Sequence, residues 1–287
     1  MLTQQVDMST LAVQAGLCFL TLGVNISVLV QKSMHNLDVS QHLDMTLLKI
    51  KLESIYVISL ICYYVCVVVQ ANGSEDFEDY VFVAGNVAFS FQVLLAVFFF
   101  FIALDRRFAM KKPIVYSQDY ASYVKNTAVT LGFLTFFFVF FYMAVARLPS
   151  PVEGEDDMFF SLADNSAILV FQLTKLVFYI LSIVIMVTCG LRFKSFLKKK
   201  RAQFMGSFVD NAKVAFRLIT KLTILMGFII VIPLVLQFGT RFVDCFIAKG
   251  ILRNESMTYL FFSTLSSVVF FCSTKIHCKT APEVSYI

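Results

Sequence analysis

Apolar runs of bilayer-spanning length recur along this chain of 287 residues. The runs cover residues 11–30, 54–70, 80–104, 127–148, 166–191, 218–239 and 257–274. A helix of about 20 apolar residues crosses the ~30 Å hydrocarbon core of a bilayer. Because lipid offers the backbone no hydrogen-bond partners, each run is expected to be an α-helix, and the short alternating segments of a barrel are not seen. The second run is short, and its helix is expected to begin nearer Leu47. The pattern predicts an all-α bundle of seven transmembrane helices.

Composition supports a membrane protein with a single domain. Hydrophobic residues make up 59% of the chain and charged residues 15%, whereas soluble domains are nearer half apolar and a quarter charged. The gaps between runs are too short for a separate soluble domain, so residues 1–287 are expected to form one seven-transmembrane unit. Residues 1–10 contain no Lys or Arg, so the basic start of a cleaved signal peptide is absent. The first run is therefore expected to be a helix of the mature protein.

The charged residues predict how the bundle is oriented. With the N-terminus outside, 19 of the 24 Lys and Arg residues fall in inner segments and 4 in outer ones. The positive-inside rule then places the N-terminus outside and the C-terminus inside. Lys49 is counted here in the first inner loop. Two sequons, at Asn72 and Asn254, fall in predicted outer loops, so both are candidate glycosylation sites.

The same count decides what the net charge of +5 means. The excess lies on the predicted cytoplasmic face, where it attracts anionic lipid and cytosolic partners, so nucleic-acid binding is not expected. The outer loops are acidic, and two interpretations stay open: solvation of the loops, or a part in gating ligand access. Cys278 lies just past the seventh run beside Lys275 and Lys279, where palmitoylation and a plain free thiol are both consistent with the sequence.

The third run ends in a motif with a physical mechanism. Asp105 is followed at once by Arg106 and Arg107, and Pro113 comes shortly after. An acid beside Arg can hold the guanidinium in a local ion pair. Once released, the long side chain can donate to a backbone carbonyl or to a partner. The alternative is a stop-transfer cluster that begins with Asp.

This tract resembles the rhodopsin-like G-protein-coupled receptors. Their third helix ends in Asp/Glu-Arg-Tyr, commonly with Ala four and Pro eight positions after the acid. Asp105, Arg106, Ala109 and Pro113 match those offsets, while Arg107 replaces the aromatic residue. The resemblance implies that a heterotrimeric G protein contacts the inner ends of helices three, five and six, with Arg106 at the centre.

Other marks of that family are partial or missing. Gly23, Asn25 and Val28 are similar to its first-helix motif with one residue inserted, and Pro233 can kink the sixth helix as its aromatic-Pro switch does. The second run has no Asp, so the family's sodium site is expected to be absent. The seventh run lacks Asn-Pro-x-x-Tyr. With 33 Phe residues and short loops, the chain resembles the divergent chemosensory receptors of nematodes. That resemblance implies a small-molecule ligand, no cofactor, and a multi-pass protein in the plasma membrane of a sensory cell.

A ligand pocket is expected in the outer half of the bundle. At ~1.5 Å per residue, Phe89 and Gln92 lie roughly 20–26 Å outward from Asp105. Lys175 is the one charge well inside a predicted run, and burying it costs at least ~2.5 kcal/mol. It can be a pocket cation that meets an acidic ligand, with Gln172 close by. The alternatives are a side chain that snorkels outward, or a fifth helix that begins deeper than Ser166.

Two other function classes were weighed against a receptor. Transporters and channels usually carry several charges within their helices, broken helices or internal repeats, and none of these patterns is evident beyond Lys175 and Pro233. An inverted orientation would instead resemble the insect-type ligand-gated channels. An enzyme is not expected, because the only histidines, His35, His42 and His277, lie outside the apolar runs, and no metal-ligand spacing is seen.

Overall fold

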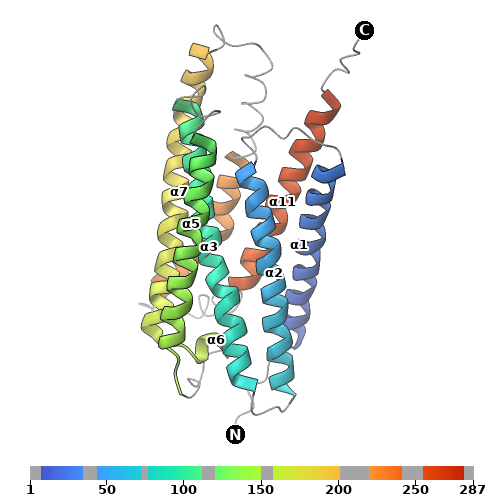
Figure 1. Cartoon of the computed structure of the whole chain (residues 1–287), viewed down its shortest axis with the longest axis vertical. Helices are drawn as coiled ribbons and strands as arrows, with labels where there is room; N and C mark the ends of the chain where they lie inside the picture. The colour runs from blue at the N-terminus through green and yellow to red at the C-terminus, as the bar shows by residue number, and fades with distance from the viewer. Residues whose placement is uncertain are drawn as a thin grey trace.

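The computed structural model describes residues 8–34, 44–72, 77–111, 120–149, 158–200, 220–240 and 255–280. Within these ranges the long elements are helices (Figure 1). They are α1 (Met8–Met34), α2 (Asp44–Ala71), α3 (Glu78–Lys111), α5 (Ala121–Val145), α7 (Asn165–Lys200) and α11 (Glu255–Thr280), with a short α6 (Met158–Ser161) before α7. Residues 220–240 lie between α7 and α11 and form the sixth long segment in chain order. This sixth segment contains the π-helical turn η4 (Gly227–Val231) and α9 (Ile232–Thr240).

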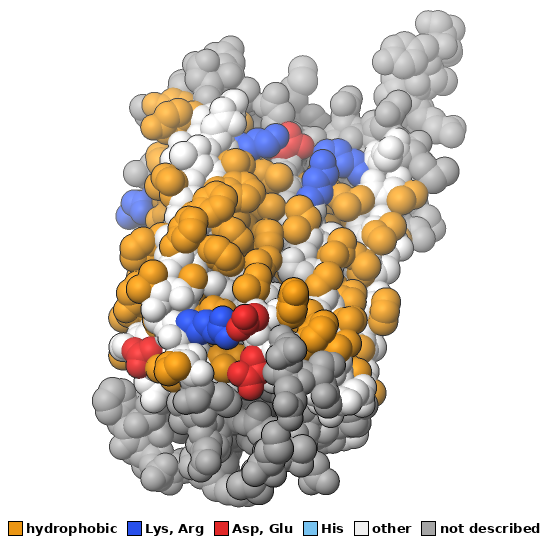
Figure 2. Space-filling model, turned by 60° about the horizontal axis from the view of Figure 1, so that its bottom comes forward, with side chains coloured by type: hydrophobic (Ala, Val, Ile, Leu, Met, Phe, Trp, Pro, Cys, Tyr) orange, Lys and Arg blue, Asp and Glu red, His pale blue; other side chains and the backbone are white. Residues whose placement is uncertain are grey.

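The lengths and compositions of these helices fit a polytopic membrane protein. In the described part of the chain, five helices are long and apolar enough to cross a bilayer, and two shorter apolar helices cover Thr220–Leu236 and Ser256–Cys272. The space-filling view agrees, because hydrophobic side chains cover the middle of the face shown and charged ones gather toward its two ends (Figure 2). The all-helical prediction is confirmed, and the structure is consistent with the seven-helix bundle.

Helix α3 lies at the centre of the bundle. It packs against α2, α5 and α7, while α1 packs against α2 and α11. Most side chains from Ala88 to Ala103 on α3 are buried, whereas α5 leaves several aromatic rings exposed on its outer side. A polar side chain on α3 therefore faces other helices and not lipid, which is the setting a binding site needs.

Helix α2 corrects the predicted boundary of the second run. It begins at Asp44, well before residue 54 and within one helical turn of Leu47, near which its start is expected. Lys49 and Glu53 lie just before the apolar run that starts at residue 54. They are one helical turn apart and form an ion pair, so the helix continues through them toward its N-terminus. Lys49 is 1% exposed. Its assignment to an inner loop is therefore wrong.

The sixth segment is irregular close to its proline. Pro233 has no N–H to donate, and the turn immediately before it is the π-helical stretch Gly227–Val231. There the Ile232 N–H donates to the Gly227 carbonyl, five residues earlier. A π turn and a proline are both recognised causes of helix distortion. The predicted irregularity at Pro233 therefore coincides with a non-α segment.

Candidate functional site

Lys175 lies inside the bundle on α7. Its side chain is buried at 2% exposure, and its Nζ donates to Oε1 of Gln92 on α3 at 3.0 Å. The ammonium also lies 3.9 Å from the centre of the Phe171 ring. Since α7 begins at Asn165, the helix does not start deeper than the predicted run. Both alternatives to a buried lysine, outward snorkelling and a later helix start, are therefore wrong.

Gln92 connects Lys175 to a third helix. Its Nε2 donates to the hydroxyl of Tyr56 on α2 at 2.9 Å, while its Oε1 accepts from Lys175. The two bonds together fix which end of the amide faces the lysine. Tyr56 in turn lies edge-on to Tyr259 of α11, with ring centres 5.2 Å apart. One chain of contacts thus joins α7, α3, α2 and α11 around Lys175.

Gln172 lies one helical turn before Lys175 and is completely buried. Within the described residues neither its Oε1 nor its Nε2 has a hydrogen-bond partner. A buried polar group without a partner costs ~1–3 kcal/mol, so the Gln172 amide is a candidate for contact with a ligand, an ion or water. Positions three apart share a helix face, so Gln172 and Lys175 can address the same molecule.

Aromatic rings surround this polar group. Phe89 lies 6.1 Å from Phe171 and 4.7 Å from Phe160, measured between ring centres. Phe160 belongs to α6, the short helix that Figure 1 places beside one end of α3, α5 and α7. The predicted pocket residues Phe89, Gln92 and Lys175 are therefore neighbours or direct partners, and their setting is a polar group inside an aromatic wall.

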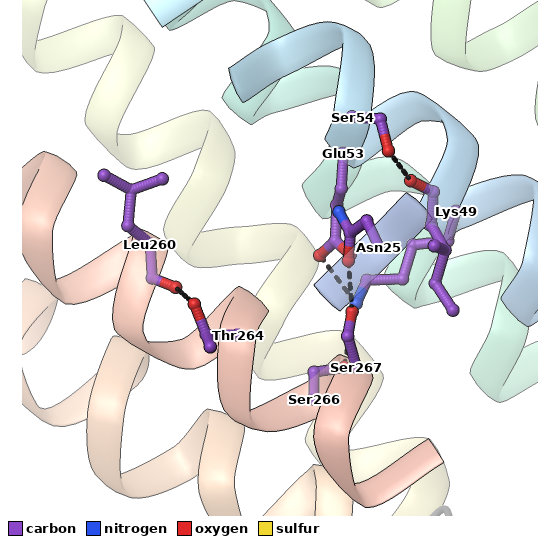
Figure 3. A network of polar contacts seen from close by, with 9 residues as sticks. Asn25, Lys49, Glu53, Ser54, Leu260, Thr264, Ser266 and Ser267 are labelled. Atoms are coloured by element: carbon purple, nitrogen blue, oxygen red, sulfur yellow. Dashed lines mark hydrogen bonds and ion pairs between the residues drawn. The ribbon is translucent and has the colours of Figure 1, made fainter. Parts of the chain in front are cut away.

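The sequence did not reveal a second buried charge group, on α2. Lys49 and Glu53 are 1% and 0% exposed, and their Nζ and Oε1 atoms lie 2.7 Å apart. Lys49 also donates to the Ser266 hydroxyl of α11 at 3.0 Å (Figure 3). Its ammonium lies 4.4 Å from the centre of the Phe99 ring. The sequence did contain a signal for this pair: Lys49 and Glu53 are four positions apart, next to the apolar residues of the second run.

A small cavity lies beside Lys49, between α2, α3, α7 and the sixth segment. It is lined mainly by apolar side chains, with the ammonium and a few hydroxyls. The lining residues are Thr46, Lys49, Phe99, Ile102, Ala103, Ser182, Met186, Leu222, Thr223 and Met226. The cavity and the ion pair place polar chemistry in the half of the bundle that also holds Asp105.

Helices α1 and α11 are joined by hydrogen bonds near this group. The Ser267 hydroxyl donates to Oδ1 of Asn25 at 2.5 Å, and the hydroxyls of Thr21 and Thr264 lie 2.7 Å apart (Figure 3 shows Asn25, Thr264 and Ser267). Asn25 is fully buried. Asn25, which belongs to the partial first-helix motif, therefore makes a polar contact between α1 and α11.

Asp105 and Arg106 are both buried at the end of α3. The Arg106 Nε lies 3.6 Å from Asp105 Oδ2, and the side chains are 9% and 1% exposed. Within the described residues, Nε and Nη2 of Arg106 have no hydrogen-bond partner. Arg107, by contrast, is exposed. The geometry matches the predicted local ion pair, and it keeps guanidinium donors available at the end of the bundle.

The structure describes some of the remaining predicted site residues and not others. Asn72 is exposed in a turn after α2, as a glycan acceptor must be. Pro113 and Asn254 lie outside the described residues. Cys278 falls within the described helix α11, but its side chain is not described. In the described part of the chain no group of three or more His, Cys, Asp or Glu residues could hold a metal ion.

Comparison with known proteins identifies the family. The family model described as serpentine type 7TM GPCR chemoreceptor Srbc matches residues 1–146, which include α1, α2, α3 and α5. No curated protein matches the chain. The match covers half of the sequence and includes the Asp105-Arg106 tract that carried the predicted resemblance. The chain belongs to the Srbc family of serpentine seven-transmembrane chemoreceptors.

Proposed function

We propose that this protein is a chemosensory receptor that binds a small, largely apolar acid beside Lys175 and activates a heterotrimeric G protein. An ammonium and two amide side chains recognise a carboxylate through charge-assisted hydrogen bonds. The aromatic rings of Phe89 and Phe171 suit an apolar body. Family membership supports a receptor, and the chemistry of this site supports the class of ligand.

The observation that carries the proposal is the buried amide of Gln172. It is fully buried, without a hydrogen-bond partner among the described residues, and one turn from a buried lysine. A ligand with a carboxylate or a neighbouring polar group would satisfy both side chains at once. Pockets of this kind combine apolar walls with a few convergent polar groups.

On the opposite side of the membrane we place the G-protein contact at Arg106. Its side chain is buried beside Asp105, and two of its guanidinium nitrogens have no hydrogen-bond partner among the described residues. A partner carbonyl that reached Arg106 would replace the Asp105 contact. Arg107, Pro113 and the distorted turn before Pro233 would then shape the path of the inner helix ends.

We also propose that the N-terminus is outside and that the protein functions in the plasma membrane of a sensory cell. The predicted positive-inside charge distribution supports this orientation. Glycosidase treatment is expected to shift the mobility of the expressed protein, and the combined Asn72→Gln and Asn254→Gln variant is expected to lose that shift. A shift that persists in this variant would contradict the assigned sites.

The experiment for the whole proposal is a screen of small carboxylic acids in cells that report both G-protein activation and membrane current. A response in the first readout alone supports a receptor. A ligand-evoked current that persists when the G protein is inhibited would favour the channel alternative. The same assay, applied to single variants, then tests the ligand site at Lys175 and the G-protein contact at Arg106 separately.

Lys175→Met is expected to weaken the response to acids by roughly 10- to 100-fold in EC50, because a charge-assisted hydrogen bond contributes ~1.5–3 kcal/mol. Lys125→Met, on the exposed start of α5, is the matched control and is expected to respond normally.

Arg106→Ala is expected to abolish G-protein activation without lowering surface expression. Undiminished signalling in either Lys175→Met or Arg106→Ala would contradict the role proposed for that residue.

A further inference from the structure

Residues 159–163, in the connection between α5 and α7, are buried to an unusual degree. Connections between helices normally run over the surface. Here Phe159 is 0% exposed, Phe160 is 9% exposed, and Leu162 and Ala163 are also buried. We call residues 158–163, which comprise α6 and the next two residues, the lid.

The Phe159 ring of the lid packs against α3 at Gly85, between two aromatic residues. The Phe159 ring stacks between Phe82 and Phe89, at 5.5 and 4.9 Å between centres. The backbone N–H of Phe159 donates to the Tyr63 hydroxyl of α2 at 3.3 Å. A Cβ at Gly85 would lie 2.6 Å from the Phe159 ring, so the missing side chain there makes the close approach possible.

The lid lies directly against the proposed ligand site. The ring of Phe160 is 6.2 Å from that of Phe171, which is the ring that Lys175 faces. Beneath this aromatic layer the polar groups of Lys175, Gln92 and Gln172 are between 0% and 2% exposed. A ligand therefore has no open route to these groups past the lid in this conformation.

An exposed ion pair fastens the segment that flanks the lid. Arg147, just after α5, pairs with Asp79 in the first turn of α3, and its guanidinium lies 5.2 Å from the centre of the Phe82 ring. Two backbone bonds, Leu148 N–H to Leu162 and Asp164 N–H to Ala146, join this segment to the lid. The Arg147 and Asp79 side chains are 34% and 73% exposed, so the pair is in contact with water.

We propose that the lid controls access to the Lys175 site and that the Asp79–Arg147 pair is its latch. The proposal rests on the proposed function in taking Lys175 and Gln172 as the ligand site. An exposed ion pair is weak and is screened by salt, so it can open under thermal motion. Opening the latch lets residues 146–148 and the lid move away from α3 together, because the backbone bonds connect them.

The test measures access without needing the natural ligand. Gln172→Cys places a thiol beneath the lid, and the purified receptor in detergent is treated with the anionic reagent methanethiosulfonate ethylsulfonate. The reagent forms a mixed disulfide with the thiol and releases its sulfinate, and mass spectrometry assigns the label to residue 172. Detergent exposes both ends of the bundle, so the result does not depend on orientation.

Labelling at residue 172 is expected to be slow in the Gln172→Cys parent. It is expected to accelerate roughly two- to fivefold when Asp79→Asn or Arg147→Gln is added, the range an exposed ion pair allows. Glu78→Gln is the matched control, since it removes the same charge one residue from the latch. The exchanged pair, Asp79→Arg with Arg147→Asp, is expected to restore slow labelling.

Phe159→Ala is expected to accelerate labelling more than either latch variant, because it removes the ring that seats the lid. If this variant does not fold, the surface variants at Asp79 and Arg147 still decide the question. Fast labelling in the parent, or equal rates in the parent, Asp79→Asn and Arg147→Gln, would overturn the proposal. Because no ligand or G protein takes part, a lid can be demonstrated even if Lys175→Met signals normally, which would refute the proposed function alone.

Discussion

Lys49 and Lys175 are both buried in the described part of the bundle, and they are held in different ways. Lys49 lies 2.7 Å from the carboxylate of Glu53, one turn along its own helix. Lys175 donates to the neutral amide of Gln92 on another helix and faces the ring of Phe171. The described contacts of Lys49 thus include a carboxylate on its own helix, whereas those of Lys175 include an amide and an aromatic ring from the ligand site that we propose. In the orientation that we propose, Lys49 lies in the inner half of the bundle with Asp105, and Lys175 lies in the outer half. We infer that the inner lysine serves the structure and that the outer one serves recognition.

A continuous row of rings lies between the two lysines. Tyr56, which accepts from Gln92, contacts Tyr259 at 5.2 Å, and Tyr259 lies 6.3 Å from Phe262. Phe262 contacts Phe99 at 5.4 Å, and Lys49 faces both rings. Contiguity alone does not prove energetic coupling. It does identify α11 as an element that changes at both groups would affect.

The largest effect is expected from making the inner lysine resemble the outer one. Glu53→Gln replaces the carboxylate beside Lys49 with an amide, and removing one partner of a buried pair costs about 3–5 kcal/mol. Thermal unfolding of the purified receptor in detergent should show a marked fall in stability. The double variant Lys49→Met/Glu53→Leu removes both charges and is expected to recover most of the loss. If Glu53→Gln unfolds at the parent temperature, the pair is not a structural element.

The sequence predicted the bundle because its apolar runs are long and because lipid leaves a helix as the only solution for each run. It missed the inner pair because Lys49 and Glu53 interrupt the hydropathy of the second run. Only the pairing of the two charges across one helical turn lets α2 extend back to Asp44. A boundary set by hydropathy therefore fails at a place where buried charges neutralise each other.

The candidate site was predicted in part for a related reason. Lys175 and Gln92 stand out as polar residues in apolar runs, and the structure brings them together. Tyr56 and Phe171 are typical membrane-helix residues, so nothing in the sequence distinguishes them from core packing. The lid was also missed, because Phe159 and Phe160 follow an acidic loop segment and their burial depends on the shape of α3 at Gly85.

The next largest effect comes from comparing two glycines: Gly85 on α3, against which the Phe159 ring packs, and Gly23 on α1, which has open space beside it. Gly85→Ala places a Cβ where the Phe159 ring lies, and overpacking of this kind costs about 1–3 kcal/mol. Gly23→Ala on α1 meets no atom within 4 Å and is expected to stabilise the helix by up to ~1 kcal/mol. The two substitutions should therefore shift thermal unfolding in opposite directions. A shift of the same sign and size in both would mean that the lid does not press on α3.

A smaller but more specific change makes the outer lysine resemble the inner one. Gln92→Glu gives Lys175 a carboxylate partner, so an acidic ligand must then compete with a built-in one. The EC50 for carboxylic acids is expected to rise by about tenfold or more, the value of one charge-assisted bond. Stability is expected to stay within about 1 kcal/mol of the parent, since the ammonium keeps a partner. Unchanged potency would show that Lys175 does not meet the acid.

The smallest effect concerns the bonds between α1 and α11 near the inner pair. Ser267→Ala removes the hydroxyl that donates to Asn25, and such interhelical bonds contribute ~0.6 kcal/mol on average in membrane proteins. Ser27→Ala is the matched control, because the Ser27 hydroxyl is exposed and bonds only to the Gly23 carbonyl of its own helix among the described residues. Thermal unfolding should therefore detect Ser267→Ala and not Ser27→Ala. If Ser267→Ala also loses ligand response while its stability stays near the parent value, α11 transmits more than structure, and the division between a structural inner group and a recognising outer group would need to be redrawn.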